Sequence, residues 1–287
     1  MVDLDTDICV CLDIDEVFMS GWRDKLEELW DDKITRLRYN YNWQLDIDNN
    51  PIVIFYFEKI HCRKGYKWVN PVHEVLSYDF DENTLTTDLI TVNHYPDNTK
   101  SRGSYLSLLE LSVLEDPLND RNMHYLGREY MYYKRWNESI DTLIKQLHLK
   151  KATWKNERCG SMRFIARCYK MLKRYDEANM WLLKAINEAP YLRDPYVEME
   201  FLHNELNNHD KVYEYINYAL SIKSHQKTYN NEVFSWNETP YDLLSIACFN
   251  LKKYNEALEN RNKALEISPY DERLLKNKEI ILNKLDI

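Results

Sequence analysis

A pattern that returns every 34 to 45 residues governs the second part of this chain. Two copies of it are nearly identical, Tyr175–Ala178 (YDEA) and Tyr254–Ala257 (YNEA). Aligning the pattern places the starts of four units near residues 120, 159, 193 and 238, which are 39, 34 and 45 residues apart. The apolar positions within each unit recur at helical spacing. The sequence therefore predicts a stack of helix-turn-helix units.

Small residues and prolines occupy fixed places in these units. Ala178 and Ala257 lie in the second helix of their units, where a small side chain lets the first helix approach closely. Pro190 and Pro269 follow that helix and end the unit. These features resemble tetratricopeptide repeats, which are solenoids of helix pairs.

The third unit and the longer spacings depart from this pattern. Glu200 and Val212 stand where small residues are usual, so the third unit matches least well. Insertions explain the longer spacings, and one of them is the polar stretch 224–236. A helix from Tyr270 to Leu285 is expected to cap the last apolar face of the stack.

The first hundred residues mix strand and helix signals. Ile8–Leu12 is a continuous apolar run, which favours a buried strand. Ser20 is the expected N-cap of a helix with an apolar face. Asp46–Pro51 predicts a turn between strands rather than a metal site. Further strands are predicted at 52–57, 66–69, 75–78 and 89–92.

An Asp-x-Asp-Glu box follows the first apolar run. It contains Asp13, Asp15 and Glu16. Two carboxylates at the end of a strand suit Mg²⁺ or Mn²⁺, which prefer hard oxygen ligands. The structural alternative is a strand that ends and turns into a helix, with an aspartate as its cap.

Together with other segments, this box resembles the later half of the catalytic domain of glycosyltransferase family 2, of the kind that carries tetratricopeptide repeats behind it. The resemblance implies a partial GT-A-like α/β domain over residues 1–117, followed by an all-α, tetratricopeptide-like domain over residues 118–287. It also implies an inverting, metal-dependent enzyme that transfers a sugar from a nucleotide-sugar to a carbohydrate, peptide or protein acceptor. The matching segments are 11–16, 20–22, 72–75, 94–95 and 100–102.

The resemblance implies a metal site and a diphosphate site. Asp13, Asp15 and His94 would hold Mn²⁺ or Mg²⁺, with Asp15 as a direct ligand. Lys100 and Arg102 would neutralise the diphosphate oxygens of the donor. The structural alternatives are a surface-loop histidine and two solvated charges at the start of a helix.

The resemblance also implies a catalytic base, which takes a proton from the acceptor as it attacks the sugar. Glu74 is the first candidate for this role, and Glu16 is the second. Alternatively, His73 and Glu74 brace a strand by hydrogen bonds.

The half of such a domain that would hold the nucleotide base does not fit before Leu4. The sequence therefore leaves a second interpretation open: a non-catalytic tetratricopeptide module with a transferase remnant. This interpretation predicts binding of a peptide or protein, or self-association through the repeats, and no binding of a nucleotide-sugar.

Composition excludes several other classes of protein. The formal net charge is −9 and no long basic run occurs, so nucleic acid is not an expected partner. No apolar stretch reaches the roughly 18 residues that a membrane span needs. The 6 cysteines show no CxxC spacing, which predicts a reducing cytoplasm.

Overall fold

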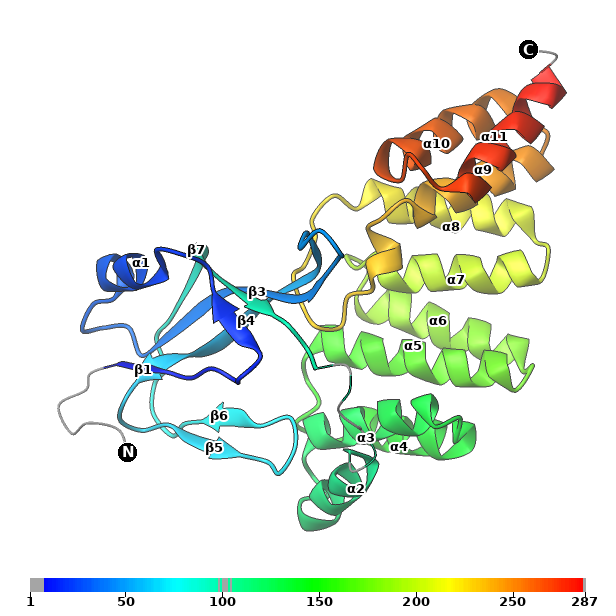
Figure 1. Ribbon diagram of the computed structural model, residues 1–287. Coiled ribbons are helices and arrows are strands. Elements are labelled where there is room, and N and C mark those ends of the chain that lie inside the picture. Colours follow the sequence, from blue (N-terminus) through cyan, green and yellow to red (C-terminus); the bar gives the residue numbers. More distant parts are fainter. Residues whose placement is uncertain (1–7, 98, 100–102, 104, 286–287) are drawn as a thin grey trace. The chain divides into compact units, whose positions relative to one another are not determined.

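The computed structural model describes residues 8–97, 99, 103 and 105–285 (Figure 1). The chain divides into two compact units. Unit 1 comprises Met1–Leu108 and Lys227–Tyr229, and unit 2 comprises Leu109–Gln226 and Asn230–Ile287. The sequence places this division later, after residue 117.

Unit 1 is built on a five-stranded sheet in the order β1-β4-β3-β7-β2, with a separate pair of strands, β5 and β6. All neighbours in the larger sheet are antiparallel except β3 and β7. Helix α1, Trp22–Leu29, contributes Leu26 to the core of this unit, which also contains Leu37 and Tyr39 of β3. The strands are β1 Ile8–Val10, β2 Glu16–Phe18, β3 Arg36–Leu45, β4 Pro51–Cys62, β5 Lys67–Val69, β6 Val75–Ser77 and β7 Thr84–His94.

This sheet corrects the predicted GT-A-like α/β domain. The run Ile8–Leu12, predicted as a buried strand, supplies only the short edge strand β1, whose residues are half-buried or exposed. A short apolar run carries no information on its pairing partner, so its place in a sheet does not follow from its composition. The N-cap of α1 also differs from the prediction. It is Gly21, in the left-handed region at φ 80°, and not Ser20.

The turn predicted around Asp46 is confirmed. Strands β3 and β4 form an antiparallel hairpin, and Leu45 faces Pro51 at its closed end. The Asp46 carboxylate accepts hydrogen bonds from the backbone N–H groups of Asp48 and Asn50 at 2.9 and 2.7 Å. The Asp46 side chain thus closes the turn by accepting hydrogen bonds from the backbone that follows it, as aspartate does in Asx turns.

Unit 2 is helical over its described residues, and most of its helices follow one another as antiparallel pairs (Figure 1). Helices α3, α5, α7 and α9 begin within four residues of the four predicted unit starts. The predicted helical repeat is therefore confirmed. The helices are α2 Tyr105–Glu115, α3 Asp120–Tyr132, α4 Trp136–His148, α5 Lys155–Met171, α6 Tyr175–Glu188, α7 Asp194–Glu205, α8 His209–Ser221, α9 Thr239–Asn250, α10 Tyr254–Ile267 and α11 Glu272–Leu285; α2 includes residues of both units.

Small residues let the paired helices approach. Ala178 and Ala257 are buried as predicted. In two pairs a serine hydroxyl also joins the helices. Ser139 donates to the Gly127 carbonyl at 2.7 Å, and Ser245 donates to the Ala257 carbonyl at 2.8 Å. The last helix, α11, buries two apolar side chains against the stack, as expected for a cap.

Across the part of the chain that the structure describes, no helix is both long and apolar enough to cross a membrane.

Candidate functional site

A lysine lies between two of the predicted acidic residues of unit 1. Lys59 Nζ is 2.6 Å from Asp13 Oδ2 and 2.8 Å from Glu16 Oε1. Glu16 is buried and also accepts a hydrogen bond from the Tyr41 hydroxyl at 2.8 Å. Burial and the Glu16 carboxylate raise the pKa of Tyr41 above its ordinary value. Glu16, the second candidate for a catalytic base, thus belongs to a buried ion pair.

The other two predicted metal ligands form a separate pair. His94 Nε2 is 3.7 Å from Asp15 Oδ2, and His94 Nδ1 is 3.0 Å from the Trp43 carbonyl oxygen. The His94 ring stacks on the Trp43 ring and is buried, so His94 is not a surface-loop histidine. Among the described residues, no three His, Cys, Asp or Glu side chains group together as a metal ion requires. Binding of Mn²⁺ or Mg²⁺ stays a prediction.

The remaining predicted site residues lie elsewhere. Glu74 is exposed and directly precedes β6. His73 has a left-handed backbone at φ 53°, and its ring lies 5.4 Å from that of Tyr105. Lys100 and Arg102 lie outside the described residues. The structure therefore does not bring Glu74 into the cluster that contains Glu16.

Unit 2 contains a cluster of buried charges that was not predicted from the sequence. Arg163 of α5 is 1% exposed and donates to the carboxylate of Glu198 on α7. Arg167, one turn later on α5, donates to both oxygens of Glu198 at 2.8 and 3.0 Å. Burial alone would raise the pKa of Glu198, but the two guanidinium groups outweigh it and lower the pKa to about 2. Two arginines four residues apart on one helix were the available sequence signal.

A segment of the loop between α8 and α9 lies on this cluster. Arg163 donates to the Asn230 carbonyl at 2.9 Å and to the Glu232 carboxylate at 2.8 Å, and Arg167 also donates to Glu232. Asp194, fully buried at the start of α7, accepts from the Glu232 backbone N–H at 2.6 Å. These contacts fix the segment through its backbone as well as its side chains.

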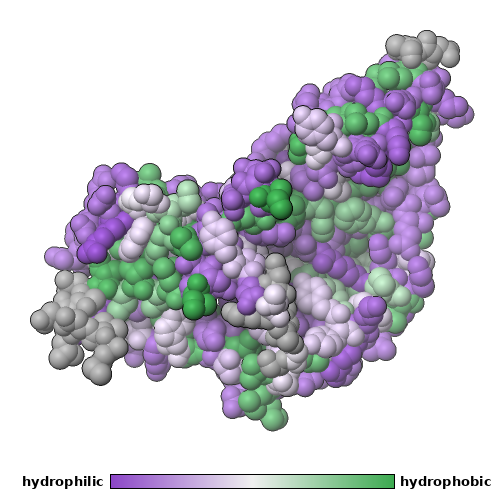
Figure 2. All heavy atoms as spheres, in the orientation of Figure 1, coloured by the Kyte–Doolittle hydropathy of each residue, from purple (hydrophilic) through white to green (hydrophobic). Residues whose placement is uncertain are grey.

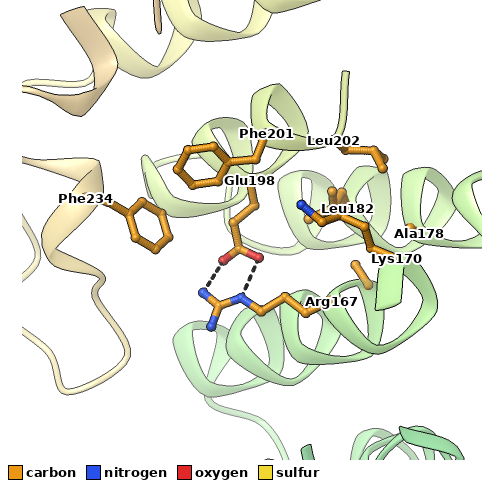
Figure 3. A pocket seen from close by; sticks show the side chains of 9 residues that line it. Arg167, Lys170, Ala178, Leu182, Glu198, Phe201, Leu202 and Phe234 are labelled. Atoms are coloured by element: carbon orange, nitrogen blue, oxygen red, sulfur yellow. Dashed lines mark hydrogen bonds and ion pairs between the residues drawn. The ribbon is translucent and has the colours of Figure 1, made fainter. Parts of the chain in front are cut away.

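A pocket of about 190 Å³ lies beside the charge cluster (Figure 3). Its lining comes from α5, α6, α7 and the loop, and six lining residues are apolar. Figure 3 shows the Phe201 and Phe234 rings on one side of the Arg167–Glu198 pair and Lys170 on the other. Lys170 Nζ lies 3.3 Å from Glu205, and the Lys170 side chain is 32% exposed. The pocket thus combines apolar walls with an accessible cation.

The molecular surface around these elements is mixed in character. Figure 2 shows hydrophilic and hydrophobic residues interspersed over the visible face of the helical unit, without one apolar patch that covers it.

The sequence matches no protein-family model and no curated protein. Among solved structures, the Cut9–Hcn1 hetero-tetramer of APC/C has a TM-score of 0.50, with 15% identity over 64% of this chain and 34% of that chain. YrrB, a TPR protein with an unusual peptide-binding site, has a TM-score of 0.49, with 12% identity over 62% of this chain and 84% of that chain. A thermophilic TPR protein of Thermus thermophilus has a TM-score of 0.45, with 18% identity over 63% of this chain and 90% of that chain.

These findings overturn the glycosyltransferase prediction. No family-2 model matches the chain, and the sheet of unit 1 is antiparallel at every pairing except that of β3 with β7. The predicted family membership, GT-A fold and enzyme assignment are therefore wrong, and the nucleotide-sugar donor has no support. The short Asp-x-Asp-Glu box was misleading because carboxylates at a strand end also form structural ion pairs, as Asp13 and Glu16 do here with Lys59.

Proposed function

We propose that the chain is an interaction module that binds a short segment of a partner protein at the pocket between α5 and α7. The observation that supports this is the pocket itself. Small-molecule and cofactor sites commonly enclose about 300–1,000 Å³, whereas this pocket has a volume of about 190 Å³. That volume suits a single side chain of a partner rather than a cofactor.

The lining indicates which partner side chains to expect. Phe201 and Leu182 present apolar surface, which favours an aromatic or large aliphatic anchor. Lys170, at the pocket and partly exposed, favours an acidic residue next to that anchor. The partner segment is therefore expected to pair an apolar anchor with a carboxylate.

Selection from a displayed random peptide library on the immobilised full chain tests this proposal. Selected peptides should share an aromatic residue or leucine beside Asp or Glu. Their affinities are then measured by anisotropy with the wild-type chain. Phe201→Ala should weaken binding about tenfold or more, as removal of a buried anchor does. Lys170→Ala should weaken binding and reduce its salt dependence.

Lys173→Ala provides a matched control. Lys173 also pairs with Glu205, at 3.1 Å, but does not line the pocket. It should therefore leave the affinity unchanged while Lys170→Ala lowers it. Failure to enrich any peptide, or equal affinities for the wild type and for correctly folded Phe201→Ala and Lys170→Ala chains, would refute the proposal.

A further inference from the structure

The loop Lys223–Trp236, between α8 and α9, has both of its ends held by one residue. Arg193 Nε donates to the carbonyl of Ile222, where α8 ends, at 2.8 Å. The Arg193 guanidinium also lies 3.8 Å from the centre of the Trp236 ring and 3.4 Å from the Ser235 carbonyl oxygen. A compact loop with adjacent ends is an Ω-loop. Its ends are thus fixed by contacts that do not involve its middle.

The middle of this loop, Asn230–Phe234, contacts unit 2 as a bound peptide would. The Asn230 carbonyl accepts a hydrogen bond from Arg163, and the Glu232 backbone N–H donates one to Asp194. The Glu232 carboxylate pairs with two arginines, and the Phe234 ring packs edge-on against Phe201 at 5.1 Å. Backbone hydrogen bonds, one acidic contact and one aromatic anchor are elements by which peptide segments are recognised. Glu232 has an extended backbone here, and Phe234 lies in the 3-10 turn Val233–Ser235.

The receiving face accommodates this segment closely at Gly160. A Cβ atom at position 160 of α5 would lie 3.2 Å from Asn230 Oδ1, so the absence of a side chain at Gly160 accommodates the loop. Asp194 and Glu198 are buried charges on α7, and the loop covers part of this charged face. Burying charges is unfavourable unless they are paired. Arg163 and Arg167 bring two positive charges to the single carboxylate of Glu198, so the arginine pair can accept one further carboxylate, as it accepts that of Glu232.

We propose that Asn230–Phe234 is an intramolecular ligand, which closes the α5–α7 face until a partner segment with an acidic residue two positions before an aromatic replaces it. This inference rests on the proposed function, because it takes the partner to be a protein segment at the same face. The expected partner residues are the same as those of the loop segment, in which Glu232 pairs with the two arginines and Phe234 packs against Phe201. Phe234 is also one wall of the pocket, so its departure enlarges the pocket.

Tethering is expected to favour the closed state. A short flexible linker gives its attached ligand an effective concentration on the order of millimolar. A free segment that binds the open face with a micromolar dissociation constant must therefore compete with a large excess. The apparent affinity of the free segment is its affinity for the open face multiplied by the fraction of molecules that are open. Weakening the loop should raise that apparent affinity at least about tenfold.

The test uses a labelled synthetic peptide with the sequence of residues 227–236, KTYNNEVFSW. Its binding is measured by anisotropy to the full wild-type chain, to a Glu232→Ala, Phe234→Ala double variant, and to a variant with residues 230–234 replaced by glycine and serine. We expect both loop variants to bind the peptide at least about tenfold more tightly than the wild type. A peptide with alanine in place of its Glu and Phe should not bind.

The control is Gln226→Ala, at an exposed position of the same loop, which should bind the peptide as the wild type does. The inference is overturned if neither loop variant binds the peptide although circular dichroism shows that the helices are intact. Library peptides that still require Lys170 would then leave the proposed function standing. Failure of both peptide types would remove both proposals.

Discussion

At the scale of single residues, Glu200 is the side chain whose surroundings fit its chemistry least. It stands at a place in the repeat where a small residue is usual. It is fully buried on α7, and within the described part of the chain neither carboxylate oxygen has a hydrogen-bond partner. Burial, and secondarily the charge of Asp242, raises its pKa well above 4.5. The folded chain therefore favours the neutral carboxylic acid.

The raised pKa of Glu200 makes the free energy of unfolding depend on pH. Because the pKa of Glu200 is raised in the folded state, the folded chain binds more protons than the unfolded chain from about pH 4.5 up to the folded pKa. Glu200 therefore stabilises most below pH 4.5 and loses that contribution as the pH rises. Glu200→Gln should flatten the pH dependence of the free energy of unfolding, measured by urea denaturation from pH 5 to pH 8.

Glu205→Gln is the control for this prediction, because the pKa of Glu205 is shifted the other way. Hydrogen bonds from Tyr175 and Lys173 lower that pKa to about 2. Its contribution is present above pH 4.5 and is lost as the pH falls towards 2. The Glu205 variant should therefore keep the wild-type slope from pH 5 to pH 8. An unchanged slope in Glu200→Gln would contradict the assignment of a raised pKa.

At the scale of elements, the close approach of α3 and α4 at Gly127 leads us to a separate prediction. A Cβ atom there would lie 2.5 Å from Cγ of Leu143, which is fully buried. Overpacking costs typically 1–3 kcal/mol, and replacing a helical glycine by alanine recovers about 1 kcal/mol. Gly127→Ala should therefore lower the free energy of unfolding by about 1 kcal/mol in urea denaturation.

A double-mutant cycle checks the cause. Leu143→Ala should itself cost about 2–5 kcal/mol, because it leaves a cavity. That cavity has room for the new methyl group, so Gly127→Ala should cost nothing further, or even stabilise, when Leu143 is already alanine. Additive effects of the two substitutions would show that the contact with Leu143 is not the cause.

The elements also show what the sequence could predict. Helix pairs such as α5 and α6 could be predicted, because the apolar periodicity of each helix is visible within a short stretch of the sequence. The central strand β3 was missed, although Leu37, Tyr39 and Tyr41 alternate with polar residues and are all buried. The sheet order could not be found this way, because pairing such as β3 with β7 depends on distant segments.

The charge cluster of unit 2 was missed for the same reason. The sequence singled out Asp13 and Asp15, whose spacing is local, and overlooked Arg163 and Arg167. Those arginines pair with the loop segment Asn230–Phe234, which lies more than 60 residues further along the chain. No periodic pattern connects the two. Charge complementarity across such a distance becomes visible only once the helices are placed.

At the scale of the whole molecule, each unit has its own hydrophobic core. Leu37 lies in the core of unit 1, and Leu182 lies in a core of unit 2; both are buried. Units with separate cores can open separately, with protection against hydrogen exchange that differs between them. This property allows the division of the chain to be tested without cutting it.

We therefore predict that two matched substitutions act locally. Leu37→Ala and Leu182→Ala each remove the same atoms from a buried site and should each cost about 2–5 kcal/mol. In hydrogen exchange followed by mass spectrometry, Leu37→Ala should speed exchange in β3 and β4 and leave α5 and α6 unchanged. Leu182→Ala should do the reverse. If either substitution speeds exchange equally in both sets of elements, the two units open as one cooperative structure, and the division at Leu108 does not describe how the chain unfolds.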